Sequence, residues 1–275
     1  MAAWWGDPTE PGNGLRQAAL GSQHLGCTRV SAALTVADSK RAFHSAFPYV
    51  IGPLYRRMVD ELLVELHLLS RQQGFQADAL FAVGLVQVFD GFAKGYRPET
   101  QRLPLFDALC SSSGFDGGAL RQQHSAALGA MGKHSVEAVK QWIEQQGKDA
   151  PEPIASALAS IQRPDFHYSR LMAVGLMALL EQAQGADAMD PAALRSYAHD
   201  LGASMGLLRE RLDKDLKLYA SNLEKMAQAV ELMEETVAAE KRKRERRSTA
   251  APAAVAPPSD TPSEGGSAPG VQTAG

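Results

Sequence analysis

The chain has 275 residues, of which 45% are hydrophobic and 21% charged, values that are ordinary for a soluble globular protein. That length allows one large domain or two small ones. The formal net charge is −3, but the run from Lys241 to Arg247 carries +5, so the remainder sums to −8. An acidic body with one basic run argues against a general nucleic-acid binder, which spreads positive charge over a face.

Two cysteines, Cys27 and Cys110, make neither a disulfide framework nor a metal site, and we expect them in a reducing compartment. The most apolar run, Leu171 to Leu180, is about half the ~20 residues that a membrane crossing needs. The amino terminus lacks the features of a secretory signal and of a transit peptide. We therefore expect a soluble protein that is made and kept inside the cell.

The densest helical pattern lies in residues 53–70, which we expect to form the central helix. Pro53 suits the first helical turn. Eight apolar side chains fall within about half of the helix circumference, an arc wide enough to pack on several neighbours. These are Leu54, Tyr55, Met58, Val59, Leu62, Leu63, Leu66 and Leu69.

A structural charge cluster is expected on the same helix. Arg56 with Asp60 and Arg57 with Glu61 are spaced for i,i+4 ion pairs. Glu65 lies at the edge of the apolar arc, so it should find an arginine or a backbone donor, because burying it unpaired would be unfavourable by several kcal/mol.

The rest of the body also has helical periodicity, and no strand pattern bounded by turn residues occurs, so the fold class is all-α. Asp165 is the expected N-cap of the helix from Phe166. Pro151 and Pro153 indicate the start of a further helix. The other expected helices cover residues 36–46, 79–93, 103–111, 116–130, 135–146, 166–183 and 191–201, with 79–93 the most buried.

We divide the chain into four segments. Residues 1–34 are expected to be a disordered extension, 35–203 a compact helical bundle, 204–247 one long protruding helix and 248–275 a disordered tail rich in Ala, Pro, Ser and Gly. The long helix would measure ~65 Å at 1.5 Å per residue.

That long helix carries a heptad pattern typical of a coiled coil. Its seam consists of two series, Met205, Leu212, Tyr219, Met226, Met233 and Leu216, Leu223, Val230, Val237. The seam is either the inner face of a last bundle helix or a partner-docking surface. We favour the inner face up to Tyr219. From about Asn222 we expect the helix to project and to dock a partner through Leu223, Met226, Val230, Met233 and Val237.

The basic run offers two interpretations. Its cations can meet anionic lipid headgroups, each worth ~1 kcal/mol near the surface. They can equally be a solvated helix end that complements the helix dipole, which we favour. The candidate membrane-surface residues are Lys241, Arg242, Lys243, Arg244, Arg246 and Arg247.

The turn Gly95–Glu99 is a second candidate docking site, because an exposed aromatic beside an arginine is a common recognition surface. Tyr96 and Arg97 would form it. The alternative is a rigid loop in which Tyr96 packs on a helix end. The sequence does not decide between the two.

Catalysis has no support in the sequence. Glu61, Glu65 and His67 could be taken for metal ligands, but the Glu-x-x-His spacing of carboxylate-bridged metal sites is missing. No Gly-rich phosphate loop, Gly-x-Ser-x-Gly elbow or Cys-x-x-Cys pair occurs. We expect no metal, cofactor or small-molecule substrate.

Several colinear blocks between about residues 35 and 240 resemble the thylakoid formation protein family, also called the photosystem II biogenesis factor family, of cyanobacteria and plastids. Residues 117–150 match only loosely. The blocks are SKRAF (39–43), LYRR (54–57), DELLVELHLLS (60–70), VFD (88–90), GYRPE (95–99), LC (109–110), GFD (114–116), YSRL (168–171), KDL (214–216) and NLEKM (222–226).

The resemblance implies a soluble, non-enzymatic helical protein at the thylakoid surface. Family members are associated with photosystem II assembly and repair, and with accumulation of the FtsH membrane protease. The implied partners are therefore that protease and photosystem II assembly components, with an anionic lipid surface as a further one. Two other readings remain open. One is a metal-dependent helical-bundle enzyme, and the other is a self-associating membrane-surface scaffold in which the seam pairs two copies.

Overall fold

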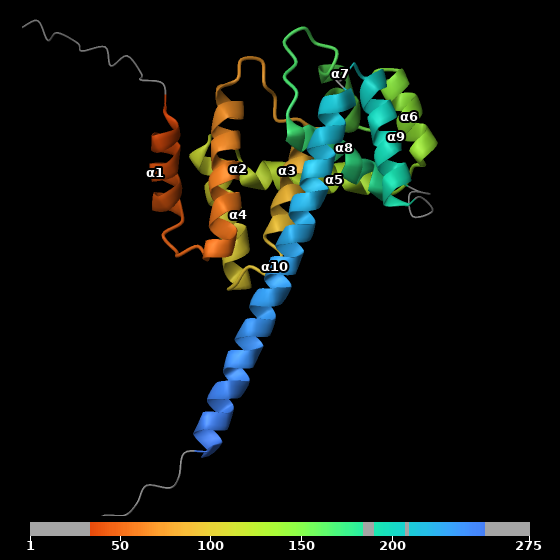
Figure 1. The fold of residues 1–275 in the computed structure, drawn as a ribbon. Coiled ribbons are helices and arrows are strands. Elements are labelled where there is room, and N and C mark those ends of the chain that lie inside the picture. The colour runs from red at the N-terminus through yellow and green to blue at the C-terminus, as the bar shows by residue number, and fades with distance from the viewer. Residues whose placement is uncertain (1–33, 184–189, 207–208, 251–275) are drawn as a thin grey trace, which may run out of the picture. The chain divides into compact units, whose positions relative to one another are not determined.

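Helices make up nearly all regular structure in the computed structural model, which describes residues 34–183, 190–206 and 209–250. No strand occurs in these ranges, so the all-α prediction is confirmed. The predictions for residues 1–33, 184–189 and 251–275 lie outside the described residues. The elements, shown in Figure 1, are α1 (Val36–Ala46), α2 (Pro53–Arg71), α3 (Ala79–Phe92), η1 (Glu99–Gln101), α4 (Arg102–Ser112), α5 (Gly117–Met131), α6 (Val136–Glu144), α7 (Ile154–Ser160), α8 (Arg170–Gln182), α9 (Pro191–Ser204) and α10 (Arg209–Ala250).

Side-chain caps fix the starts of several helices. The Asp78 carboxylate accepts a bond from the Phe81 amide at 3.0 Å, and Asp116 does the same for the Ala119 amide at 3.0 Å. The Ser135 hydroxyl caps α6. Each cap satisfies an amide that the helix itself leaves without a partner. This local chemistry explains why the expected starts of α3, α5 and α6 lie within one residue of the observed ones.

The expected start of α8 is wrong. The helix begins at Arg170, and its cap is the Ser169 hydroxyl, which accepts from the Leu171 amide at 3.1 Å. Asp165 is engaged elsewhere, because both its carboxylate oxygens accept from the guanidinium of Arg163 at 2.7 and 3.0 Å. Residues 166–168 therefore lead into the helix in an irregular conformation.

The centre of the body is the crossing of α3 and α8 rather than α2. A Cβ on Gly84 would lie 1.7 Å from the Leu171 carbonyl oxygen, and one on Gly175 would lie 2.0 Å from the Leu80 carbonyl oxygen. Only glycines at both positions allow two helix backbones to approach so closely. Residues of α3 and α8 are buried on nearly all sides, in agreement with the expectation for 79–93.

The other helices surround this crossing. α2 packs against α1 and α4 on one side, so its expected central place is wrong, although its apolar arc is buried as expected. α9 contacts α6, α8 and α10. α10 crosses α9, α8 and α3 in turn and then continues past the other helices (Figure 1).

The long last helix differs at both ends from the expected 204–247. α9 continues to Ser204, and Gly206 then adopts a φ of +80°, a left-handed conformation that ends a helix. α10 begins at Arg209 and continues to Ala250, so the first residues of the expected tail are helical. The basic run therefore lies within the helix.

Candidate functional site

The inner part of α10 forms part of the body's own core. Leu212 and Leu216 are buried, and the ring of Tyr219 meets that of Phe92 edge-on at 5.9 Å. The interpretation of the seam as an inner face up to Tyr219 agrees with this arrangement. The Tyr168 hydroxyl donates to the Asp215 carboxylate at 2.9 Å, a second link between α10 and the body.

The body also covers the next three seam residues, where we expected a docking surface. Leu223 packs over Gly91 of α3, and a Cβ there would lie 2.9 Å from a Leu223 methyl carbon. Val230 packs over Gly95, where a Cβ would lie 2.5 Å from its Cγ1. Leu223, Met226 and Val230 are half-buried. The expectation that α10 leaves the body at about Asn222 is wrong, because two glycines make room for these side chains.

Beyond Val230 the seam becomes more exposed. Met233 is still half-buried, as Val230 is, and Val237 is 64% exposed. Leu232, which is not part of the predicted seam, is 66% exposed and widens the apolar surface. We call Leu232, Met233 and Val237 the outer stripe. The sequence analysis missed Leu232, because the heptad pattern assigns it to the polar side of the helix.

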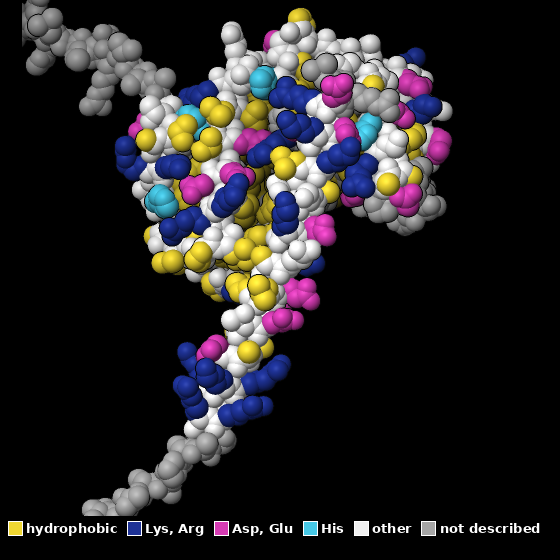
Figure 2. Space-filling model, in the orientation of Figure 1, with side chains coloured by type: hydrophobic (Ala, Val, Ile, Leu, Met, Phe, Trp, Pro, Cys, Tyr) yellow, Lys and Arg dark blue, Asp and Glu magenta, His cyan; other side chains and the backbone are white. Residues whose placement is uncertain are grey.

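The basic run follows the outer stripe directly. Lys241, Arg242, Lys243, Arg244, Arg246 and Arg247 are all exposed. Figure 2 shows their side chains gathered around the far end of α10. They surround the helix instead of lining one face, so this segment presents charge in every direction and has no apolar side of its own.

Of the two interpretations of the turn Gly95–Glu99, the one in which Tyr96 forms an exposed recognition surface is wrong. Its side chain is 2% exposed, and its ring packs edge-on against Tyr55 at 5.0 Å. Burial raises the pKa of the Tyr96 hydroxyl. Arg97 is exposed and lies 3.8 Å from Glu99. The turn is thus the rigid loop of the alternative interpretation, and α10 packs on it through Val230 at Gly95.

The charge cluster on α2 is partly as expected. The Arg57 Nε donates to Glu61 at 2.8 Å, but Asp60 pairs with Lys40 of α1 at 3.2 Å instead of with Arg56. A tertiary neighbour therefore replaces the expected i,i+4 pair.

The expectation that Glu65 finds an arginine is confirmed. Its carboxylate accepts from Nε and Nη2 of Arg170 at 2.9 and 2.7 Å, which ties α2 to α8. Burial raises the pKa of the Glu65 carboxyl, and the bonds from Arg170 oppose that rise. His67 is the third residue that could be taken for a metal ligand. It is buried, and a 2.8 Å hydrogen bond joins its Nδ1 to the Ser39 hydroxyl.

Glu61, Glu65 and His67 are thus engaged with three different side chains. Nowhere in the described ranges do three His, Cys, Asp or Glu side chains group as a metal site would require. Cys110 is buried, and burial raises its pKa to about 12, which makes it a poor nucleophile.

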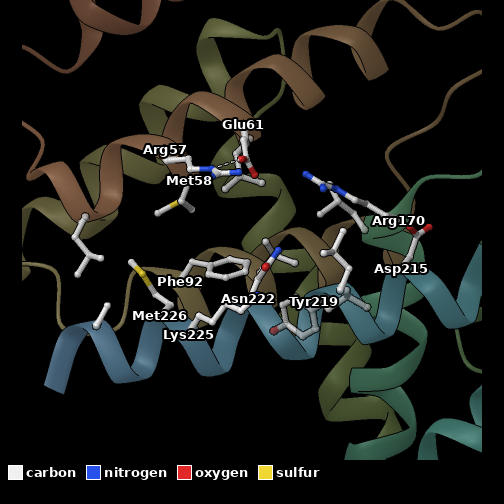
Figure 3. A pocket seen from close by; sticks show the side chains of 17 residues that line it. Arg57, Met58, Glu61, Phe92, Arg170, Asp215, Tyr219, Asn222, Lys225 and Met226 are labelled. Atoms are coloured by element: carbon white, nitrogen blue, oxygen red, sulfur yellow. Dashed lines mark hydrogen bonds and ion pairs between the residues drawn. The ribbon is translucent and has the colours of Figure 1, made fainter. Parts of the chain in front are cut away.

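One cavity of the body is a groove of about 430 Å³ between α2 and α10, floored by α3 and α8. We call it the α2–α10 groove. Figure 3 shows Arg57 and Glu61 on the α2 side, Asn222 and Lys225 on α10, and the ring of Phe92 between them. Its apolar lining consists of Leu54, Met58, Leu62, Val88, Phe92, Leu171, Val174, Leu218, Tyr219, Met226 and Ala229, and its polar lining of Arg57, Glu61, Arg170, Asp215, Asn222 and Lys225.

This groove was not predicted from the sequence. Its walls come from four helices, and the heptad pattern does not mark Leu218, Lys225 and Ala229 as neighbours of α2. Only the way that α10 crosses the body brings them together. The arrangement suits binding of an elongated apolar partner, and it places no nucleophile beside a general base.

Comparison with known proteins agrees with this structure. The sequence profile of the family described as "Thylakoid formation protein" matches residues 35–248. Protein Thf1 of Prochlorococcus marinus (strain MIT 9313) is 58% identical over 78% of this chain and 89% of its own length. Protein Thf1 of Synechococcus sp. (strain CC9605) is 51% identical over 79% and 95%. The chain belongs to the thylakoid formation protein family.

The fold of this family member is shared with a solved relative. The 1.55 Å structure of Psb29 superposes with a TM-score of 0.68 at 35% identity, covering 77% of this chain and 98% of that one. The family is named for thylakoid formation and not for a reaction. Among the helices described, none combines the length and apolarity that a membrane span requires.

Proposed function

We propose that this chain is a non-enzymatic accessory protein in thylakoid membrane formation and in photosystem II biogenesis and repair. It acts by protein–protein binding, and its partners are an FtsH-type membrane protease, photosystem II assembly components, or both. The observation that carries the proposal is the outer part of α10, which holds an exposed apolar stripe clear of the body and ends in the basic run.

The docking argument rests on Leu232, Met233 and Val237. Exposed apolar side chains that lie close together on a helix often mark a surface that binds another helix or a groove. Methionine adapts its shape to different partners. The body-packed part of α10 ends at Val230, so the outer stripe can bind a partner without disturbing the core.

The localisation follows from the basic run. Six exposed cations at the end of one helix can meet the anionic headgroups of a membrane surface, each worth ~1 kcal/mol there. We propose that the protein binds peripherally to the cytoplasmic face of the thylakoid membrane. This contact is electrostatic, because the segment lacks an apolar side to insert.

Truncation after Glu231 tests the docking proposal. This variant removes the outer stripe and basic run but keeps Leu223, Met226 and Val230. We expect its helical circular dichroism and thermal midpoint to be unchanged, whereas FtsH complexes from detergent-solubilised thylakoid membranes should no longer co-purify with it. A point variant, Val237→Asp, should weaken the same interaction, and Ala227→Asp, at an exposed alanine of α10 outside the outer stripe, serves as its control. Undiminished FtsH recovery with the truncated chain would refute docking through the outer stripe.

Vesicle sedimentation tests the membrane contact separately. The full chain should sediment with vesicles that contain anionic lipid and release them as salt is raised, because exposed charges are screened. Truncation after Glu240, which removes the basic run and keeps the outer stripe, should abolish sedimentation. Equal binding to vesicles of neutral phosphatidylcholine would show that the basic run is not the cause.

A further inference from the structure

The charges along α10 change sign where the helix extends beyond the body. Residues 231–240 carry four glutamates and no lysine or arginine, a charge of −4, and the basic run after them carries +5. Figure 2 shows acidic side chains between the body and the basic run. All four glutamates are exposed, namely Glu231, Glu234, Glu235 and Glu240. An anionic surface therefore attracts the far end of α10 and repels the segment just before it.

One long side of α10 faces the body. The outer stripe continues this side, because each of its residues follows by seven positions, about two helical turns, a residue that packs on the body or lines the α2–α10 groove. The pairs are Lys225 with Leu232, Met226 with Met233, and Val230 with Val237. A flat membrane in contact with the outer stripe from this side would have to pass through the helices that α10 crosses (Figure 1).

The opposite side of α10 is free of the body but acidic. Glu224, Glu231 and Glu235 are separated by seven and then four residues, so they lie on this side together. All three are exposed, as is Gln228 between them. A helix lying on this side would bring three carboxylates to the lipid headgroups together with the cations of the basic run. Neither long side of α10 therefore suits a helix that lies flat on an anionic membrane.

We infer that α10 meets an anionic membrane end-on, with the last turns of the basic run at the surface and the body held away from it. This inference rests on the membrane contact proposed above. The surface charge acts over about 8 Å at physiological ionic strength. With the helix axis steep, Glu235 lies about 18 Å from Arg247 along the axis, beyond that reach. The end-on orientation thus keeps the attraction of the cations and avoids the repulsion of the carboxylates.

The orientation determines which kind of partner reaches the outer stripe. Leu232 and Val237 lie about 22 and about 15 Å from Arg247 along the helix axis. The stripe is then too far from the headgroups to insert into acyl chains, and it faces the space between the body and the membrane. Its partner is an extramembrane segment of a membrane-bound protein, close to the point where that protein leaves the bilayer.

Charge removal at the two ends of the basic run tests the orientation. Arg246→Gln with Arg247→Gln at the tip removes the same charge as Lys241→Gln with Arg242→Gln nearer the body. Affinity is measured by sedimentation with vesicles of equal parts phosphatidylglycerol and phosphatidylcholine. The tip pair should lose about thirtyfold, and the inner pair only about fourfold, because it lies about 7.5 Å farther from the surface. Equal losses would overturn the end-on orientation.

Energy transfer from α10 to the membrane measures the orientation directly. In a Cys27→Ser background, a donor dye is attached at Ala227→Cys, Ala239→Cys or Ser248→Cys, all at exposed positions, while Cys110 is buried. The same vesicles carry an acceptor dye on their headgroups. Transfer should rise steeply from the first position to the last, which are about 32 Å apart along the helix. Equal transfer at the three positions would show a helix that lies flat.

Neutralising the acidic side tests the cause of the orientation. One variant replaces the three glutamates of that side with glutamine, by Glu224→Gln, Glu231→Gln and Glu235→Gln. This change should let the helix approach the surface and raise transfer from Ala227→Cys by more than about twofold. The matched control replaces three exposed glutamates outside α10, by Glu137→Gln, Glu144→Gln and Glu152→Gln, and should leave transfer unchanged. The same result in both variants would refute the role of the acidic side. Circular dichroism checks that each variant is folded.

An environment-sensitive dye at Val237→Cys tests the assignment of the partner. Its emission should stay that of a dye in water when the chain binds vesicles. Emission typical of acyl chains would place the outer stripe in lipid and overturn the assignment.

The orientation and the membrane contact fail in different ways. A full chain that does not sediment with the anionic vesicles at low salt refutes the membrane contact, and the orientation with it. A chain that sediments but shows equal transfer at all three dye positions refutes the orientation and leaves the membrane contact standing.

Discussion

The inner and outer halves of α10 share one heptad pattern but have opposite environments. From Leu212 to Val230 the pattern packs on α9, α8, α3 and the turn at Gly95. Past Val230 the pattern continues with Met233, which is half-buried, and Val237, which is 64% exposed. The difference shows that a hydrophobic period identifies which side of a helix is apolar, whereas the neighbouring elements determine what covers that side.

The largest expected effect lies in the body on which the inner half packs. Gly84→Ala places a Cβ against the Leu171 carbonyl oxygen, so α3 and α8 must separate. We expect a loss of about 4 kcal/mol or more in the free energy of unfolding, or failure to fold. Urea denaturation measures it. Gly129→Ala is the matched control, because a Cβ there meets nothing within 4 Å, and it should be neutral or stabilising. Equal effects of the two substitutions would mean that the crossing is not tightly packed.

A leucine pair tests the two halves of α10 directly. Leu212 is 0% exposed, and Leu212→Ala should reduce the unfolding free energy by about 3 kcal/mol through lost burial and a cavity. Leu232→Ala in the outer half should change it by less than about 0.5 kcal/mol. Chemical denaturation at a concentration where the protein is monomeric provides both values. Similar losses at the two positions would contradict the division of α10.

Arg170→Ala tests the ion pair that ties α2 to α8 beside the groove. Without the guanidinium, Glu65 is a buried carboxylate that lacks its partner, and we expect a loss of about 2–3 kcal/mol at neutral pH. Burial already raises the Glu65 pKa, and the substitution raises it further, since the opposing bonds are lost.

The sign of the pH dependence follows from that rise. A carboxyl whose native pKa is raised binds more protons in the native state, so stability falls as pH increases through that pKa. The deficit of Arg170→Ala relative to the native chain should therefore shrink as the pH is lowered and Glu65 becomes protonated. Urea denaturation at neutral and mildly acidic pH measures this change, and Glu65→Gln in the same background should abolish it.

The smallest expected effect is at the point where α10 leaves the body. Gly95 has a φ of +80°, and a Cβ there would meet Val230, so Gly95→Ala should lower stability by about 2 kcal/mol. Gly114→Ala, at a φ of +87° with open space around it, should lose only about 1 kcal/mol. Thermal melts compare the two variants. Adding Val230→Ala to Gly95→Ala should remove the extra loss of stability relative to Gly114→Ala. If it does not, then α10 does not pack on this turn.

Local signals explain what the sequence predicted correctly. Asp78, Asp116 and Ser135 are caps that act within three residues, so the starts of their helices could be read directly. Ser169 is a cap of the same kind, but in the sequence Asp165 is an equally good candidate for the N-cap. Only the folded chain shows that the Asp165 carboxylate is bonded to Arg163 instead. The Glu65 carboxylate required a cation, yet its identity as Arg170, 105 residues away, came from packing.

By itself the sequence determined the all-α class, most helix boundaries, the long last helix with its heptad pattern and basic run, and the resemblance that the family comparison confirms. These properties depend on residues a few positions apart or on the order of sequence blocks. The tertiary structure decided that α3 and α8 form the centre, that Tyr96 is buried, that α10 leaves the body after Val230 and that a groove lies beside it. Each of these depends on how closely two backbones approach, which glycines such as Gly84, Gly91 and Gly95 permit but do not by themselves require.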